Sequence, residues 1–216
     1  MVEDKNRRPL ASRETGWAHG LTRRLAATSI TPNQISIASM VAAALGGLSF
    51  WLAGEADGVE RGLFLLGAAI LCQLRLLCNL LDGMVAVEAG KSAPDGMFWN
   101  ELPDRVADIM IIVGVGLACG QLALGWAAAA FAVLTAYVRE LGHANGAPVD
   151  FSGPMAKPHR MAVVTFVAVL SIFDPLWAGN DLILIIGLWI VAIGALVTTL
   201  RRSARLVADL RRRSTS

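Results

Sequence analysis

The chain has 216 residues, of which 55% are hydrophobic and 17% are charged, and its formal net charge is +2. This composition is too apolar and too poor in charge for an ordinary soluble domain. We find no nucleic-acid-binding motif, so a nucleic-acid partner is not expected. The composition therefore indicates an integral membrane protein.

The first apolar feature after a polar lead is an amphipathic pattern in residues 16–30. Apolar side chains recur there at i, i+4 and i+8, while two arginines fall elsewhere. The residues concerned are Trp17, Leu21 and Leu25, with Arg23 and Arg24 off the apolar face. This pattern is typical of a helix that lies in the membrane interface, with a frayed linker as the alternative.

Six apolar runs follow, each near the length of about 20 residues that a helical membrane span needs. They cover residues 34–53, 62–86, 104–120, 122–141, 161–177 and 182–200. Thr31 can cap the first of them, and Pro32 suits its first helical position. The predicted fold class is therefore an all-α integral membrane protein, a six-transmembrane-helix bundle with an N-terminal amphipathic interfacial helix.

Three regions are expected along the chain: a lead with the amphipathic helix (1–30), the membrane domain (31–203) and a basic tail (204–216). Lys and Arg gather in the lead and the tail, whereas the connectors 54–60 and 174–181 contain acids and neither Lys nor Arg. Because positively charged loops stay in the cytoplasm, both termini are predicted to be cytoplasmic and the chain to cross the inner membrane several times. The basic ends also suit an anionic lipid surface.

Polar side chains form two stripes at helical spacing near the second and third apolar runs. The first stripe is Arg75, Asn79, Asp82 and Ala86, and the second is Asn100, Asp104 and Asp108. A connector with glycine and proline can bring the stripes face to face. Carboxylate and amide oxygens suit hard cations such as Mg²⁺ or Mn²⁺ rather than zinc. The alternative is a polar helix contact in which Arg75 or Arg105 neutralises the acids, although ionisable groups inside membranes favour a functional reading.

The spacing of these residues resembles the signature of the CDP-alcohol phosphatidyltransferase family, D-x2-D-G-x2-A-R-x8-G-x3-D-x3-D. The matching positions are Asn79, Asp82, Gly83, Ala86, Val87, Gly96, Asn100 and Asp104. The spacing agrees at every step, and six spans with a basic amphipathic lead extend the resemblance over nearly the whole chain. The departures are two asparagines in place of the first and third aspartates and a valine in place of the arginine.

The resemblance implies a transferase that joins an alcohol to the lipid-side phosphate of CDP-diacylglycerol or a related CDP-alcohol and releases CMP. It implies one or two Mg²⁺ or Mn²⁺ ions as cofactors, with Asp104 as a ligand or general base. The implied metal ligands are Asn79, Asp82, Asn100 and Asp104, and Glu101 and Asp108 can restore the charge that the two amides lack. Gly83, Ala86 and Gly96 would allow close approach of the nucleotide.

Three cations outside the motif resemble phosphate-binding residues of the family: Arg139, Lys157 and Arg160. They mildly favour a phosphorylated alcohol as acceptor, while plain membrane anchoring would also explain Lys157 and Arg160. A homodimer among membrane lipids is expected from the resemblance, and small residues such as Gly114 and Gly116 permit close helix contacts.

Two other functions remain open at the level of sequence. Asn79, Val87 and Asn100 are also compatible with a weak or inactive relative that binds CDP-lipid or another lipid. A transporter or channel would explain polar stripes, but these acids cluster at one membrane face rather than along a path.

Overall fold

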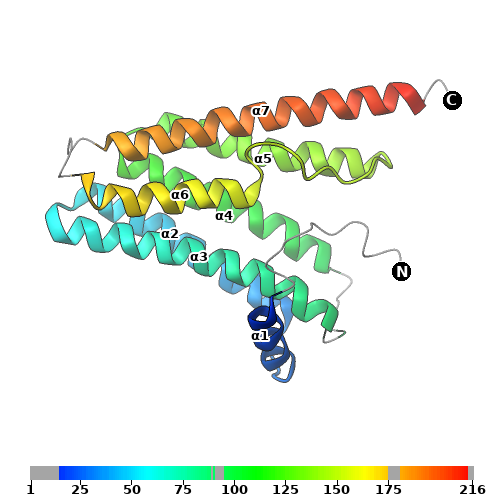
Figure 1. The fold of residues 1–216 in the computed structure, drawn as a ribbon, viewed down its shortest axis with the longest axis horizontal. Coiled ribbons are helices and arrows are strands. Elements are labelled where there is room, and N and C mark those ends of the chain that lie inside the picture. Colours follow the sequence, from blue (N-terminus) through cyan, green and yellow to red (C-terminus); the bar gives the residue numbers. More distant parts are fainter. Residues whose placement is uncertain (1–14, 89, 91–94, 175–180, 214–216) are drawn as a thin grey trace.

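A computed structural model describes residues 15–88, 90, 95–174 and 181–213, and these form helices without any strand (Figure 1). The helices are α1 (Gly16–Ala26), α2 (Pro32–Glu55), α3 (Gly58–Glu88), α4 (Gly96–Ala118), α5 (Leu122–Ala144), α6 (Lys157–Ser171) and α7 (Leu182–Arg213). The first fourteen residues of the expected lead and the last three of the expected tail lie outside the described residues.

Four helices, α2, α3, α5 and α7, are long and apolar enough to cross a membrane. The prediction of an all-helical membrane protein is thereby confirmed. The other two expected spans have different bounds from their apolar runs. α4 begins at Gly96, eight positions before its run, so its first turns carry polar side chains, and α6 ends at Ser171 after only 15 residues.

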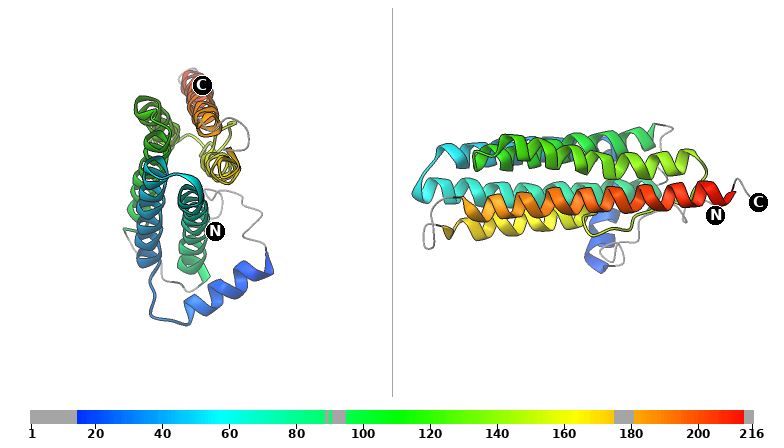
Figure 2. Two further views of the ribbon diagram at one scale, coloured as in Figure 1. Left: turned by 90° about the vertical axis from the view of Figure 1, so that its left-hand side faces the viewer. Right: turned by 90° about the horizontal axis from the view of Figure 1, so that it is seen from above.

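Helices α2 to α7 run side by side and close into a ring, whose neighbours in order are α2, α3, α6, α7, α5 and α4 (Figure 2). α4 also reaches α7 and α3 across the ring. This arrangement places the C-terminal half of α3 and the N-terminal half of α4 beside the start of α6. The two predicted polar stripes are therefore brought to one end of the bundle.

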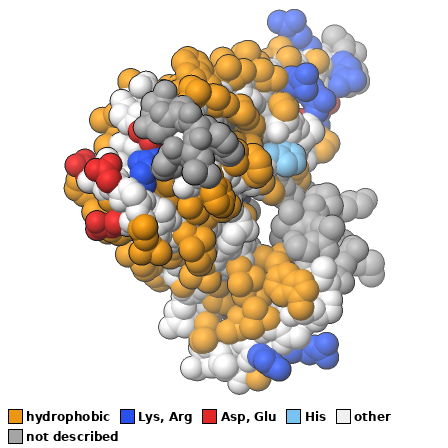
Figure 3. All heavy atoms as spheres, turned by 60° about the vertical axis from the view of Figure 1, so that its left-hand side comes forward, with side chains coloured by type: hydrophobic (Ala, Val, Ile, Leu, Met, Phe, Trp, Pro, Cys, Tyr) orange, Lys and Arg blue, Asp and Glu red, His pale blue; other side chains and the backbone are white. Residues whose placement is uncertain are grey.

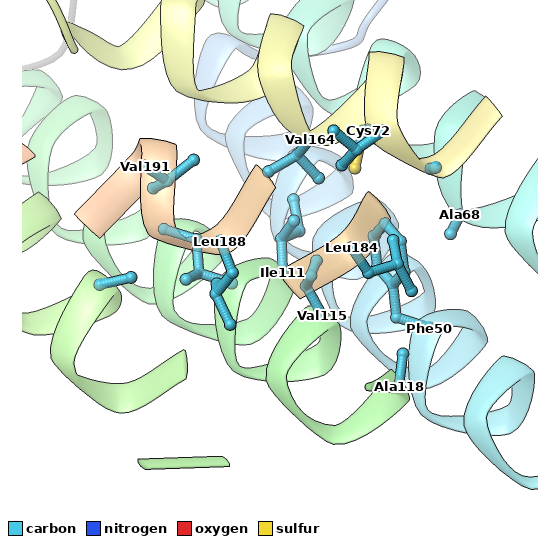
Figure 4. Packing of buried hydrophobic residues seen from close by; sticks show 14 of the residues in the cluster. Phe50, Ala68, Cys72, Ile111, Val115, Ala118, Val164, Leu184, Leu188 and Val191 are labelled. Atoms are coloured by element: carbon cyan, nitrogen blue, oxygen red, sulfur yellow. The ribbon is translucent and has the colours of Figure 1, made fainter. Parts of the chain in front are cut away.

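The interior away from that end is apolar and closely packed. Phe50, Ile111, Leu188 and Cys72 are almost fully buried there (Figure 4), and so is Leu65. Burial of such side chains stabilises the fold by about 1.5–3 kcal/mol each.

Glycines set the distance between α2 and α4. A Cβ added to Gly47 would lie 2.4 Å from the carbonyl oxygen of Met110, and one added to Gly114 would lie 2.6 Å from that of Gly47. Only a glycine pair permits this approach. The sequence indicates that Gly114 permits a close helix contact, and in the structure this contact is made within the chain, with Gly47 of α2.

The entry to α2 is fixed by a reciprocal cap. Gln34 N donates to Thr31 Oγ1 at 3.2 Å, Thr31 N donates to Gln34 Oε1 at 3.0 Å, and Pro32 occupies the first helical turn. Such a capping box satisfies two backbone donors that a helix start otherwise leaves free. The predicted start of the first span is confirmed.

α1 lies across the end of the bundle and is four residues shorter than expected (Figure 1). Its Ala18 packs against Leu80 and Met84 of α3, and His19 Nδ1 contacts Glu88 Oε1 at 2.8 Å. Trp17 remains 56% exposed on the outer side. α1 is therefore held against the same end of α3 that carries the polar stripe.

Charge is distributed unevenly along the bundle. Acidic side chains gather at the end where α2 and α3 are connected, and basic ones gather at the other end of the molecule, at α1 and the C-terminal part of α7 (Figure 3). Hydrophobic side chains cover most of the surface between these ends. α7 continues as a helix to Arg213, well past the end of its predicted apolar run at residue 200.

Candidate metal and phosphate site

The two polar stripes meet through direct hydrogen bonds between α3 and α4. Asn79 Nδ2 donates to Asp104 Oδ1 at 2.8 Å, and Arg75 Nη2 donates to the carbonyl oxygen of Asp104 at 3.2 Å. These bonds join residues that are 25 and 29 positions apart in the chain. The helical spacing seen in the sequence therefore does place both stripes on facing surfaces.

Asp82 is a buried carboxylate at the contact between α3 and α2, with only 4% of the residue exposed. Ser36 Oγ donates to its Oδ2 at 2.8 Å, and the backbone N–H of Gly83 donates to its Oδ1 at 2.6 Å. Among the described residues, no Lys or Arg nitrogen forms an ion pair with Asp82. A buried charge without a cation is costly, so this carboxylate is suited to receive one from outside the chain.

Two serines of α2 complete the site and were missed by sequence reasoning. Ser36 bonds Asp82, and Ser39 Oγ donates to Asn79 Oδ1 at 2.9 Å. Both are buried and lie three positions apart, on one face of α2. The sequence pattern that could have identified them is the position of two hydroxyl side chains on one face of an otherwise apolar run.

Asp104 is held by an amide and several cations, including Arg105, whose Nη2 lies 3.9 Å from Asp104 Oδ2. Its Oδ1 accepts from Asn79 and lies 3.5 Å from Arg75 Nη2, while its Oδ2 pairs with the ammonium of Lys157 at the start of α6. The side chains of Asp104 and Lys157 are 13% and 17% exposed. Lys157, assigned from sequence to phosphate binding, thus contacts the last acid of the motif.

Asp108 lies one turn deeper and is fully buried between two arginines. Its Oδ1 accepts from Arg75 Nη2 at 2.8 Å and its Oδ2 accepts from Arg160 Nη2 at 2.5 Å. Arg160 also donates to the carbonyl oxygen of Met155 at 2.9 Å. Both oxygens of Asp108 are committed to these arginines, so the geometry favours a positioning role for Asp108 and Arg160 over direct contact with a metal or a phosphate.

A basic hollow adjoins this cluster on the side of α5 and α7. It is lined by Arg105, Thr135, Ala136, Arg139, Phe151, Ala156, Lys157, Arg160 and Arg202. Glu101 pairs with Arg105 at 2.8 Å and with Arg139, which places this acid among arginines rather than beside Asp82. A neighbouring cavity of about 240 Å³ shares Arg139 and Arg202 with the hollow.

Arg202 is a third residue that sequence reasoning missed, because it follows an apolar run and was counted with the basic end of the chain. It is 5% exposed, and it donates to the carbonyl oxygens of Ser152 at 2.9 Å and Thr135 at 2.7 Å. Arg202 thereby ties the segment before α6 to α5 and α7.

That segment is also fixed by its own turn. Gly153 has a φ of 127° and lies against Thr198, where a Cβ would meet Thr198 Cγ2 at 2.4 Å. Partial burial raises the pKa of Asp150, but hydrogen bonds from the hydroxyl and backbone N–H of Ser152 outweigh it and hold that pKa below its usual range. Asp150 therefore stays ionised beside Arg205 and closes the turn.

Several known proteins are similar to this chain, although no family model matches it. Phosphatidylinositol phosphate synthase of Streptomyces avermitilis is 27% identical over 93% of this chain and 78% of that protein. The protein of the same name from Mycolicibacterium smegmatis is 26% identical over 80% of this chain and 76% of that protein. The bifunctional IPC transferase and DIPP synthase of Rubrobacter xylanophilus is 33% identical. That match covers 67% of this chain and 32% of the larger protein.

The fold is shared with solved structures as well. The crystal structure of Mycobacterium tuberculosis phosphatidylinositol phosphate synthase with CDP-DAG bound has a TM-score of 0.72 at 20% identity and covers 88% of this chain and 92% of that one. The same protein in complex with manganese and citrate gives the same TM-score and covers 88% of each chain. The chain is thus similar in sequence and in fold to phosphatidylinositol phosphate synthases, which are CDP-alcohol phosphatidyltransferases.

The remaining positions of the family motif line the outer part of the site. Gly83 and Ala86 are half-buried on α3, while Asn100 is exposed on the second turn of α4. Gly96 has open space where a Cβ would be, so no atom of the chain itself requires a glycine there. Val87, in place of the family arginine, is 52% exposed.

The oxygen donors fit a divalent cation, but with less charge than the family signature provides. No three acidic, histidine or cysteine side chains among the described residues are grouped as a metal site, because two motif positions are amides. The buried or half-buried oxygens are those of Asp82, which accepts from Ser36, and of Asn79 and Asp104, which are bonded to each other, with Ser39 donating to Asn79. An oxygen-only set with a buried, unpaired carboxylate suits Mg²⁺ or Mn²⁺.

Proposed function

We propose that this protein is a divalent-metal-dependent phospholipid synthase that transfers a phosphatidyl group from CDP-diacylglycerol, or a related CDP-alcohol, to an alcohol acceptor. The observation that carries the proposal is the position of Asp104. This acid lies between the motif residue Asn79 and Lys157, at the border of a basic hollow with Arg139. A proton acceptor beside a phosphate-binding surface is what this transfer requires.

In the proposed reaction, the hydroxyl oxygen of the acceptor attacks the phosphorus that carries the diacylglycerol group. A new P–O bond forms, the bond from that phosphorus to the CMP oxygen breaks, and CMP leaves with the electron pair. Asp104 accepts the hydroxyl proton. A bound Mg²⁺ or Mn²⁺, held by Asp82 with Asn79, Asn100 and Asp104 as further candidate ligands, would supply positive charge to the pyrophosphate oxygens.

The chain's own side chains orient the two substrates. Lys157 holds the carboxylate of Asp104 and can release it toward an incoming hydroxyl, because its flexible stem carries a single mobile charge. Arg139 lies next to Phe151, with the guanidinium carbon 5.4 Å from the ring centre, and presents a planar donor group to the hollow. A guanidinium suits bidentate binding of a phosphate.

We infer that the acceptor is itself a phosphorylated polyol. The hollow and the neighbouring cavity together are lined by several arginines, and the hollow is also lined by Lys157, which pairs with Asp104; Asp82 lines neither of them. Two of the similar proteins are named phosphatidylinositol phosphate synthases, which is compatible with such an acceptor.

The proposed setting is the inner membrane, with six spans, both termini in the cytoplasm and two copies forming a homodimer. α4 has 23 residues, which gives a length of about 35 Å at 1.5 Å per residue, enough to cross a hydrocarbon core of about 30 Å. α6 is shorter but is packed between α3 and α7. α1, with Trp17 facing outward, would lie in the cytoplasmic interface.

The test is CMP release from CDP-diacylglycerol by the purified protein in lipid nanodiscs with Mn²⁺ or Mg²⁺. Inositol phosphate, glycerol phosphate, inositol, glycerol and serine are compared as acceptors, with Asp104→Asn as the inactive variant and Asp57→Asn, at an exposed position between α2 and α3, as the matched control. We expect CMP with a phosphorylated acceptor from the parent and the control only. CDP-diacylglycerol binding without CMP release from any acceptor would instead establish a lipid-binding protein.

A further inference from the structure

The amide at position 79 is fitted to its neighbours as an amide. Its Oδ1 accepts from Ser39 at 2.9 Å and its Nδ2 donates to Asp104 Oδ1 at 2.8 Å. A carboxylate in the same place would put two anionic oxygens at hydrogen-bond distance, which requires a proton or a cation between them. Asn79 removes the need for a cation between positions 79 and 104.

Asp104 and Asp108 already have cations from the chain. Lys157 contacts Asp104 Oδ2, and Arg75, which is fully buried, reaches both acids from the other side. Arg160 completes the pairing of Asp108 at 2.5 Å. A further dication beside Asp104 would have to displace or approach these fixed positive charges.

Asp82 differs from both. It is buried, but it accepts only from a hydroxyl and a backbone N–H, and it forms no ion pair with Lys or Arg among the described residues. Four cations, Arg75, Arg105, Lys157 and Arg160, form ion pairs with Asp104 or Asp108, whereas none of them forms an ion pair with Asp82. The unmet demand for positive charge is local to Asp82.

We propose that this protein holds one divalent cation, anchored by Asp82, and that the ammonium of Lys157 supplies the positive charge that a second cation would bring beside Asp104. The proposal rests on the proposed function, because it concerns the metal of that reaction. It assigns Lys157 as a built-in counter-charge, and it explains why two amides can replace acids in the motif without leaving a charge imbalance.

The experiment counts metal ions without turnover. Metal-free protein in nanodiscs is titrated with Mn²⁺ and followed by calorimetry and by electron paramagnetic resonance, with and without CDP-diacylglycerol. We expect one Mn²⁺ per chain and the six-line spectrum of an isolated ion. Two Mn²⁺ per chain, or a spectrum of two coupled ions, would overturn the proposal.

Variants locate the ion and the counter-charge. Asp82→Asn should weaken Mn²⁺ binding by about 100-fold or more, whereas Asp104→Asn should retain one ion with a smaller loss. Loss of the ion in Asp104→Asn but not in Asp82→Asn would place it on the wrong acid and reject the proposal. Circular dichroism and gel filtration verify that each variant is folded. If a variant does not fold, the number of Mn²⁺ ions bound by the unaltered protein still tests the proposal.

A gain of the second site is the positive test. The triple change Asn79→Asp, Asn100→Asp and Lys157→Met restores the acids and removes the ammonium, and we expect it to bind two Mn²⁺. The matched control keeps Lys157 with both aspartates and should bind the second ion at least about 10-fold more weakly. Equal affinity in the two variants would exclude Lys157 as the counter-charge. Because CMP release is measured separately, a failed stoichiometry and a failed enzymatic function give different results.

Discussion

The buried ion cluster around Asp108 predicts a large loss of stability on one isosteric change, Asp108→Asn. Asp108 accepts from Arg75 at 2.8 Å and from Arg160 at 2.5 Å, and all three residues are at most 1% exposed. An asparagine keeps one oxygen, so it can accept from one arginine only. Its NH₂ group then faces the other guanidinium, donor against donor.

The magnitude follows from these two effects. Loss of a hydrogen bond to a charged group costs about 1.5–3 kcal/mol, and placing an amide N–H against the buried Nη2 of the second arginine, in place of a carboxylate oxygen, adds a desolvation cost of similar size. Breaking a buried ion pair from one side typically costs about 3–5 kcal/mol in total. For a domain of this length, that lowers the midpoint of thermal unfolding by roughly 6–20 °C.

The assay is thermal unfolding in detergent, followed by circular dichroism at one fixed scan rate, because membrane proteins often unfold irreversibly. Asp209→Asn is the matched control. Asp209 is partly exposed on α7, where it pairs with Arg213 at 2.9 Å, and such a surface pair contributes less than about 1 kcal/mol. An Asp108→Asn midpoint within about 2 °C of that control would refute the argument that both arginines depend on this carboxylate.

Three further predictions follow from single contacts. Gly47→Ala should destabilise the bundle by about 1–3 kcal/mol in the same unfolding assay, because its Cβ would lie 2.4 Å from a backbone oxygen of α4, whereas Gly20→Ala, with open space around its Cβ, should not. Thr31→Ala should cost about 1 kcal/mol, since it removes the side chain that caps α2, and no change would mean that the cap is dispensable. Arg139→Gln should raise the KM for a phosphorylated acceptor at least about 10-fold and hardly alter that for an unphosphorylated one, and an equal effect on both acceptors would separate Arg139 from phosphate binding.

Sequence periodicity predicts the helices well where apolar character alone defines them. The bounds of α2 and α5 lie within a few residues of their runs, because those segments are apolar throughout and end in turn-forming residues. α4 starts earlier because its first turns face the site and are polar, so they carry no apolar signal. α7 continues through Arg213 because helix propensity and i, i+4 pairs such as that of Asp209 with Arg213 extend it where hydropathy no longer does.

The candidate site is predicted unevenly for a related reason. Helical spacing suffices to place Asn79 opposite Asp104, since both lie on helices joined by a short connector. It does not show that Asp108 is enclosed by two arginines, because Arg160 comes from a helix 52 positions away. Ser36 and Arg202 were missed for the same reason: each looks unremarkable in its own segment, and its role depends on contacts with distant helices.

The glycine contact between α2 and α4 is what makes the polar end of the bundle possible. By allowing the backbones to touch at Gly47 and Gly114, it seats α2 closely against the helices that carry the motif, and the same helix presents Ser36 and Ser39 to Asp82 and Asn79. With those hydroxyls as donors, a buried carboxylate and a half-buried amide both have hydrogen-bond partners within the protein before any cation binds. The packing of the apolar half of the bundle therefore affects the polar site at the other half. A substitution at Gly47 should weaken Mn²⁺ binding as well as the stability of the fold, although Gly47 contacts no candidate ligand.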